Sequence, residues 1–124
     1  MRVLVAARDV RVRQALSRLL ELNGNRVVGA TDAPRLLLEL GDQLRPDLVV
    51  LEMDRSAESH DLQVVEELAR SGHAVIAVCS GSTTCAAVLR AGARASLDKD
   101  ADFPDRLGEA IRAVAGPWMS APPA

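Results

Sequence analysis

The strongest constraint on the fold of this chain is a run of four apolar residues at positions 48–51, Leu-Val-Val-Leu, that ends at Glu52. An Arg-Pro-Asp sequence precedes the run, so the segment 47–52 predicts a short strand buried on both faces of a parallel sheet. In open α/β sheets, functional residues gather where the parallel strands reach their carboxyl ends. Glu52 stands at such a place, and we interpret its carboxylate as the centre of a candidate site.

Four further short apolar runs, at 2–6, 26–30, 74–79 and 93–97, alternate with segments in which apolar residues recur at helical spacing. Asn23-Gly24, Gly72 and Gly92 predict helix ends, whereas Thr31 or Asp32 and then Ser59 predict helix caps. We predict five helices, of which the fourth is a short helix at 84–91 and the fifth spans 104–115. The predicted buried faces of the other helices are Val12, Ala15, Leu16, Leu19 and Leu20 in the first, Leu36, Leu37, Leu40 and Leu44 in the second, and Leu62, Val65 and Leu68 in the third. The fifth helix is predicted to bury Leu107, Ala110, Ile111 and Val114. This strict alternation predicts an α/β fold, a doubly wound, flavodoxin-like parallel sheet with strand order 2-1-3-4-5.

Length and composition narrow the possible functions. The chain has 124 residues, which suits one domain, and 48% of them are apolar, enough for a core. The net charge is −2 and the aromatic residues are one Phe and one Trp, so the chain alone lacks a basic face or stacking platform for nucleic acid. Without a long apolar segment or leader, we expect a cytoplasmic protein that does not enter a membrane.

The two cysteines, Cys79 and Cys85, lie at a predicted strand end and near a predicted helix start. Their spacing indicates neither a disulfide framework nor a zinc site. A redox role for Cys85 at the helix N-terminus is the less favoured alternative.

The segment 45–52 resembles the third strand of a response-regulator receiver domain. The segments 91–93 and 97–101 are similar to the fifth strand, invariant lysine and following loop of that family, and 109–116 is similar to the last helix of NarL/LuxR-type receivers. The resemblance covers nearly the whole chain. It implies a receiver-like domain at 1–116, and at 117–124 the start of a linker to a C-terminal helix-turn-helix domain that would bind DNA.

The resemblance also implies a degenerate phosphorylation pocket. Lys99 matches the invariant lysine of the family, but Glu52 stands where the family has its phospho-acceptor Asp. Ala7 and Arg8 replace the two acids that hold Mg²⁺. Cys79, followed by Ser80, takes the place of the Thr or Ser that binds the phosphoryl group, and Ser96 takes the place of the aromatic switch residue.

Charge accounting connects these replacements. An intact pocket, with three carboxylates and one ammonium, carries a charge of about −2 that Mg²⁺ offsets, whereas Glu52, Arg8 and Lys99 together give about +1. We therefore predict no metal or other cofactor. We expect a Glu52–Lys99 contact within about 4 Å, or else Arg8 as the partner of Glu52. Asp9 is interpreted as a helix cap rather than a metal ligand.

These observations predict a regulatory domain rather than an enzyme: an atypical receiver, or pseudo-receiver, of a two-component transcription regulator that acts without aspartyl phosphorylation. We expect a homodimer, with a histidine kinase or a small-molecule ligand as a further partner and DNA bound only through the C-terminal domain. The alternative is a ligand-sensing module that binds a small acidic metabolite at Arg8, Lys99 and the Ser/Thr-rich loop 80–84. A flavodoxin-like enzyme is disfavoured because the chain has no nucleophile–base pair and no Gly-rich phosphate loop.

Overall fold

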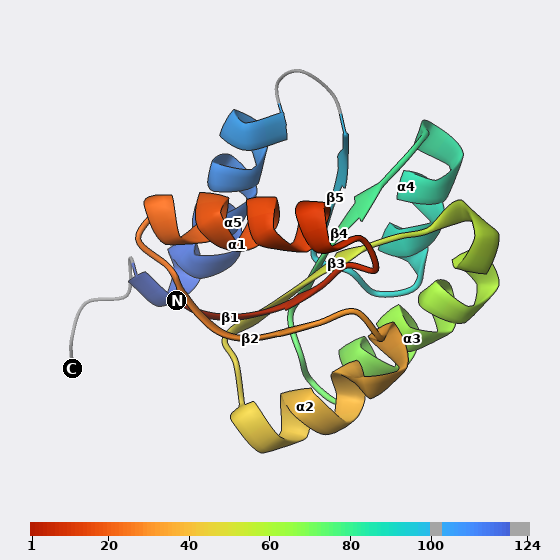
Figure 1. Cartoon of the computed structure of the whole chain (residues 1–124), viewed down its shortest axis with the longest axis horizontal. Helices are drawn as coiled ribbons and strands as arrows, with labels where there is room; N and C mark the ends of the chain where they lie inside the picture. The colour runs from red at the N-terminus through yellow and green to blue at the C-terminus, as the bar shows by residue number, and fades with distance from the viewer. Residues whose placement is uncertain (100–102, 120–124) are drawn as a thin grey trace.

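The computed structural model describes residues 1–99 and 103–119 (Figure 1). In this part of the chain, strands and helices alternate from end to end. In order, the elements are β1 (Arg2–Ala6), α1 (Val10–Leu22), β2 (Arg26–Thr31), the 3₁₀ turn η1 (Pro34–Leu36), α2 (Leu37–Leu44), β3 (Leu48–Glu52), the 3₁₀ turn η2 (Arg55–Ala57), α3 (Glu58–Arg70), β4 (Val75–Cys79), α4 (Ser82–Arg90), β5 (Ala95–Asp98) and α5 (Phe103–Met119).

The five strands form one parallel sheet in the order β2-β1-β3-β4-β5, which confirms the predicted flavodoxin-like topology. The central strands β1, β3 and β4 are almost completely buried, as expected for strands covered on both faces. One core layer lies under α1 and α5 and the other under α2, α3 and α4. Figure 1 shows α1 and α5 together on one side of the sheet and α2 and α3 on the other.

Local sequence signals explain most helix boundaries. Asp9 caps α1, because its side chain accepts a hydrogen bond from the backbone N–H of Arg11 at 2.7 Å. The same helix ends at Asn23, and Gly24 follows with a φ of 84°, the left-handed conformation that glycine adopts at low cost. Both features confirm the boundaries predicted from the sequence.

Two predicted caps are wrong, because a 3₁₀ turn precedes the helix in each case. Thr31 is the last residue of β2 and its hydroxyl accepts from the N–H of Ala33, so η1 leads into α2 without a side-chain cap. Ser59 lies inside α3 rather than at its start. There the capping side chain is that of Asp54, which accepts from the N–H of Ser56 at the start of η2.

Helix α5 is longer than the segment 104–115 predicted from the sequence, since it continues to Met119 through Pro117. A proline removes only one backbone donor, so the helix before it keeps its other hydrogen bonds. The prediction of a linker at 117–124 falls partly on residues 120–124, which lie outside the described residues. Within the described residues, no helix is both long and apolar enough to cross a membrane.

Candidate functional site

The predicted site residues meet at the carboxyl edge of the sheet. Glu52 is the last residue of β3 and Cys79 the last residue of β4, while Arg8 follows β1 and Lys99 follows β5. Backbone hydrogen bonds hold this edge together, including one from the N–H of Lys99 to the carbonyl of Cys79 at 3.2 Å. The parallel topology therefore brings together side chains that are far apart in the sequence.

Glu52 and Lys99 form the expected ion pair, with 3.0 Å between Nζ of Lys99 and Oε2 of Glu52. The Glu52 side chain is only 13% exposed, whereas that of Lys99 is 39% exposed. Among the described residues, no donor has hydrogen-bond geometry toward Oε2 of Glu52. The short distance without that geometry means that the attraction is mainly Coulombic, and Lys99 is the charge that compensates this buried carboxylate.

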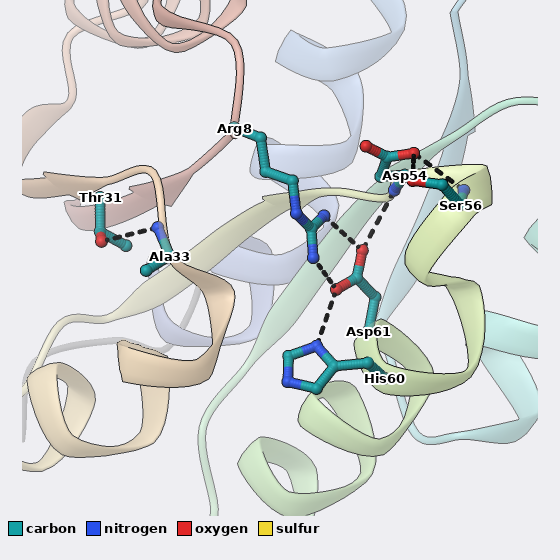
Figure 2. Close-up of polar contacts among 7 residues, drawn as sticks. All are labelled: Arg8, Thr31, Ala33, Asp54, Ser56, His60 and Asp61. Atoms are coloured by element: carbon teal, nitrogen blue, oxygen red, sulfur yellow. Dashed lines mark hydrogen bonds and ion pairs between the residues drawn. The ribbon is translucent and has the colours of Figure 1, made fainter.

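Arg8 does not pair with Glu52, and that alternative prediction is wrong. Its guanidinium instead makes a bidentate pair with Asp61 of α3, with N–O distances of 2.8 and 2.7 Å (Figure 2). A planar guanidinium matches the two oxygens of a carboxylate, so this geometry is favoured over a single contact. The pair joins the loop after β1 to the first turn of α3, and it places a fixed cation beside Glu52.

Asp61 is the site residue that the sequence analysis missed. Its side chain has no exposed surface, and it also accepts hydrogen bonds from the N–H of Asp54 at 3.1 Å and lies 3.3 Å from Nδ1 of His60. Burial alone raises the pKa of the Asp61 carboxyl, but the hydrogen bonds from Arg8 and from Asp54 lower it below its usual value. The hydrogen bond to Asp61 in turn raises the pKa of Arg8. Both groups are therefore charged at neutral pH.

The sequence does contain a pattern that marks Asp61 as a buried residue. Asp61, Val64, Val65 and Leu68 are spaced at i, i+3, i+4 and i+7, and all four are buried on one face of α3. An acidic residue in register with an apolar helix face is unusual, because a buried carboxylate needs a partner. This pattern indicates a buried charge, although it does not identify Arg8 as the partner.

With Asp61 included, the charge balance of the site changes from the predicted +1 to about 0, since two cations face two carboxylates. Asp54 lies at the rim, where the backbone N–H and then the hydroxyl of Ser56 lower its pKa. Ala7 has no exposed surface and packs in the core, so it offers no ligand.

These residues do not fit the Mg²⁺ that the receiver fold implies. Mg²⁺ requires several oxygen ligands in near-octahedral geometry, but the two residues that follow β1 are the buried Ala7 and Arg8, whose guanidinium is paired with Asp61. Both carboxylates of the site are already paired with cations. Among the described residues, no group of three or more His, Cys, Asp or Glu side chains is placed to hold a metal ion.

The remaining site positions surround Cys79. Cys79 and Cys85 form a disulfide, which the spacing of the two residues did not indicate. The short turn between β4 and α4 brings the two residues together, with 5.7 Å between their Cα atoms. Ser80 follows Cys79 in this turn and is half-buried. Ser96 lies on β5 in register with Ala77 of β4.

Several solved structures that are similar to this chain come from response regulators. The signal receiver domain of NarL from Mycobacterium tuberculosis is 26% identical to this chain, with 93% of this chain and 95% of that domain aligned at a TM-score of 0.76. A response-regulator receiver domain protein from Clostridium thermocellum has 21% identity, coverages of 96% and 97%, and a TM-score of 0.81. A DNA-binding response regulator of the LuxR family from Staphylococcus aureus has 20% identity, coverages of 91% and 97%, and a TM-score of 0.77.

No protein-family model matches the sequence, and no curated protein is significantly similar to it. The similar structures nevertheless agree on one class: the chain has the flavodoxin-like fold of response-regulator receiver domains, which are regulatory rather than catalytic modules. The response regulator domain of CheB from Thermotoga maritima also has this fold, at 20% identity and a TM-score of 0.76. The fold alone therefore does not define the effector that such a domain controls.

Proposed function

We propose that this chain is an atypical receiver domain, a pseudo-receiver, that forms the regulatory part of a cytoplasmic transcription regulator and acts without aspartyl phosphorylation or Mg²⁺. The observation that carries the proposal is the Arg8–Asp61 pair. It places a guanidinium where the resemblance to receivers calls for metal-binding acids. Glu52 stands at the acceptor position and is itself paired with Lys99.

Phosphoryl transfer to a receiver depends on a metal ion that neutralises the transferring group and on an acceptor carboxylate placed in line with it. A divalent cation entering this site would meet Arg8, whose pKa is raised further by Asp61. An attack by Glu52 would also have to disrupt its ion pair with Lys99. Both requirements of the reaction are therefore opposed by contacts within the folded chain.

Glu52 also supports a signalling role that needs no phosphorylation. It is one methylene longer than Asp and carries about one negative charge, compared with nearly two for a phosphorylated side chain. Its contact with Lys99 holds that carboxylate at the end of β3. We propose that this arrangement biases the domain toward an active-like conformation, and that a partner or a chemical signal shifts the equilibrium further.

The first test measures metal binding and phosphorylation directly. We expect no heat of Mg²⁺ binding in calorimetry, and no phosphorylated species by mass spectrometry after incubation with acetyl phosphate, under conditions that label an ordinary receiver. Glu52→Asp should remain unlabelled, because Arg8 still occupies the position of a metal ligand. Micromolar Mg²⁺ binding that is lost in Glu52→Ala, or a stable acyl phosphate on Glu52, would refute the proposal.

We further propose that two copies of the chain pair through α1 and α5. An apolar groove runs between these helices, and its lining residues are Val12, Ala15, Leu16, Arg18, Leu19, Leu22, Val78, Lys99, Phe103 and Pro104. Leu22 is 75% exposed, which is unusual for a leucine at the edge of an apolar groove unless a partner covers it. A second copy is the preferred occupant, because an isologous contact covers both grooves at once.

Leu89 provides a matched control for this proposal, because it is an exposed leucine on α4, away from α1. We expect sedimentation to show a dimer for the wild-type chain and for Leu89→Glu, but a monomer for Leu22→Glu. A wild-type chain that remains monomeric at high micromolar concentration would count against any dimer. Loss of the dimer in Leu89→Glu alone would place the interface on the α4 side instead.

In this proposal a histidine kinase is at most a binding partner, and DNA contacts belong to a C-terminal domain that the segment 117–124 would lead to. The alternative of an acidic metabolite bound at Arg8 and Lys99 has less support. Both cations are already paired with carboxylates, so an anionic ligand would have to displace Asp61 or Glu52. A thermal-shift screen with anionic metabolites would reveal such a ligand as a rise in melting temperature.

A further inference from the structure

The disulfide between Cys79 and Cys85 links the candidate site to the helix beside it. Cys79 ends β4 at the site, and Cys85 lies in the first half of α4. Their Cα atoms are 5.7 Å apart, within the range that a disulfide requires without backbone movement. The placement of β4 and α4 in this structure therefore accommodates the bond.

Both sulfur atoms have surroundings that suit either redox state. Cys79 is fully buried, and its sulfur lies 3.4 Å from the carbonyl oxygen of Leu97 on β5, which a thiol could use as an acceptor. Cys85 is half-buried and packs against the core layer under α2, α3 and α4. Reduction would thus leave the buried Cys79 thiol with a hydrogen-bond acceptor, and the half-buried Cys85 is the sulfur that a small oxidant reaches first.

The position of the disulfide means that it constrains α4. This helix packs against β4 and β5 and is joined to α3 by a hydrogen bond of 2.8 Å from the hydroxyl of Thr84 to Glu58. Ser96 on β5, where the resemblance to receivers implies an aromatic switch residue, has no ring that could couple the end of β4 to α4. The disulfide provides that coupling covalently, because Cys79 and Cys85 belong to the two elements concerned.

We propose that Cys79 and Cys85 form a reversible thiol–disulfide switch that responds to hydroperoxides and sets the mobility of α4. The inference rests on the proposed function, since it names the signal that replaces phosphorylation at the same site. In the oxidised state α4 is tied to the end of β4. In the reduced state only non-covalent contacts hold the helix, and it can adopt further positions.

The oxidation balances with hydrogen peroxide as the oxidant. The Cys85 thiolate attacks one peroxide oxygen, the O–O bond breaks, and the leaving hydroxide takes up the thiol proton to become water, leaving a sulfenic acid on Cys85. The sulfur of Cys79 then attacks the Cys85 sulfur. The S–S bond forms, and the sulfenic hydroxyl leaves with the Cys79 proton as a second water. Two electrons pass from the cysteines to the peroxide. A dithiol later reduces the Cys79–Cys85 bond to two thiols by thiol–disulfide exchange and is itself oxidised to a disulfide.

The first experiment counts thiols. The purified chain is reduced with dithiothreitol, freed of reductant, exposed to stoichiometric hydrogen peroxide, and then denatured and alkylated with iodoacetamide. We expect two alkylated cysteines before peroxide and none after it, with no change in oligomeric mass under non-reducing conditions. Renewed treatment with dithiothreitol should restore both. Two free thiols after peroxide, or a bond that a dithiol fails to reduce in the folded chain, would overturn the proposal.

The second experiment measures the consequence for the helix by amide hydrogen exchange. Oxidation should slow exchange across 85–90 of α4 by about tenfold or more, while α1 on the opposite face of the sheet serves as an internal reference. The folding equilibrium should also shift toward the folded state by about fortyfold, as expected for closing a loop with a sequence separation of 6. Equal exchange in α4 in both states would show a structural bond rather than a switch.

Cys85→Ser is the matched variant, because it keeps the size and removes only the partly exposed sulfur. Peroxide should leave exchange in its α4 unchanged at the rate of the reduced wild-type chain, and Cys79→Ala should behave in the same way. A peroxide response in Cys85→Ser equal to that of wild type would overturn the proposal. Acetyl phosphate labelling repeated in both redox states tests the proposed function separately, since it reports on Glu52 and not on the thiols.

Discussion

Replacing Arg8 by Met tests whether the pair with Asp61 organises the site. The substitution keeps the aliphatic stem and removes two charge-assisted hydrogen bonds of 2.8 and 2.7 Å. Asp61 then remains as a carboxylate without exposed surface. Breaking a buried ion pair costs about 3–5 kcal/mol, but the Arg8 side chain is 31% exposed and solvent screens part of its charge. We therefore expect the free energy of unfolding to fall by about 2–4 kcal/mol.

The loss of stability in Arg8→Met should depend on pH, and the direction of this dependence follows from the pKa of Asp61. In the wild-type chain this pKa is lowered below 3.8, so the stabilisation is present above that value and disappears as the pH falls through the lowered pKa. In Arg8→Met the pKa of Asp61 should rise, because burial still raises it while the hydrogen bonds from Arg8, which lower it, are lost. Protonation then relieves the buried charge, and the difference in stability between the two proteins should shrink as the pH falls from about 7 to about 4.

Urea denaturation followed by circular dichroism at several pH values measures both effects. Asp61→Asn is the matched variant, since it preserves shape while removing the charge, and Arg8→Met/Asp61→Asn completes a double-mutant cycle. The double variant should lose less stability than the sum of the two single losses. Additive losses that do not change with pH would refute the reasoning, because they would mean that the two side chains act independently.

Three further predictions concern other parts of the molecule. Glu52→Gln and Lys99→Met should each lower the free energy of unfolding by about 1–3 kcal/mol, and together by less than the sum; denaturant titrations that give additive losses would contradict the ion pair. Gly92→Ala should cost about 1–3 kcal/mol, because Gly92 has a φ of 113° and an added Cβ would lie 2.7 Å from Cβ of Ala69; an unchanged melting temperature would argue against this strain. The chain alone, with a net charge of −2, should not bind a defined DNA duplex at physiological salt, and submicromolar affinity in fluorescence anisotropy would show that its role has been misread.

The sequence predicts the fold well because the signals for it are local and repeated. Each strand is a short apolar run. Glycine marks the helix ends at Asn23-Gly24 and at Gly72. The order of the strands then follows from the topology rules for alternating strands and helices. The Glu52–Lys99 contact was predictable for the same reason, since both residues stand at carboxyl ends of strands in one parallel sheet.

The partner of Arg8 was not predictable in this way, because Asp61 lies on a helix rather than at a strand end. The two residues are 53 positions apart, and their contact depends on how far η2 carries the start of α3 toward β1. The disulfide was not predictable for a different reason. A spacing of six residues across a strand, a turn and a helix brings two sulfur atoms together only for some orientations of the helix. Such orientations are set by tertiary packing, which a pattern of residue types does not contain.

The Arg8–Asp61 pair also has a consequence in terms of mass action. A metal ion that arrives from solution occupies its site according to its free concentration, so a chelator empties such a site. Arg8 is carried by the chain itself, and its effective concentration at the site is set by the loop that holds it, not by the medium. The cation beside Glu52 can therefore be neither diluted nor chelated, and the charge state of this edge of the sheet stays constant when the supply of divalent ions varies.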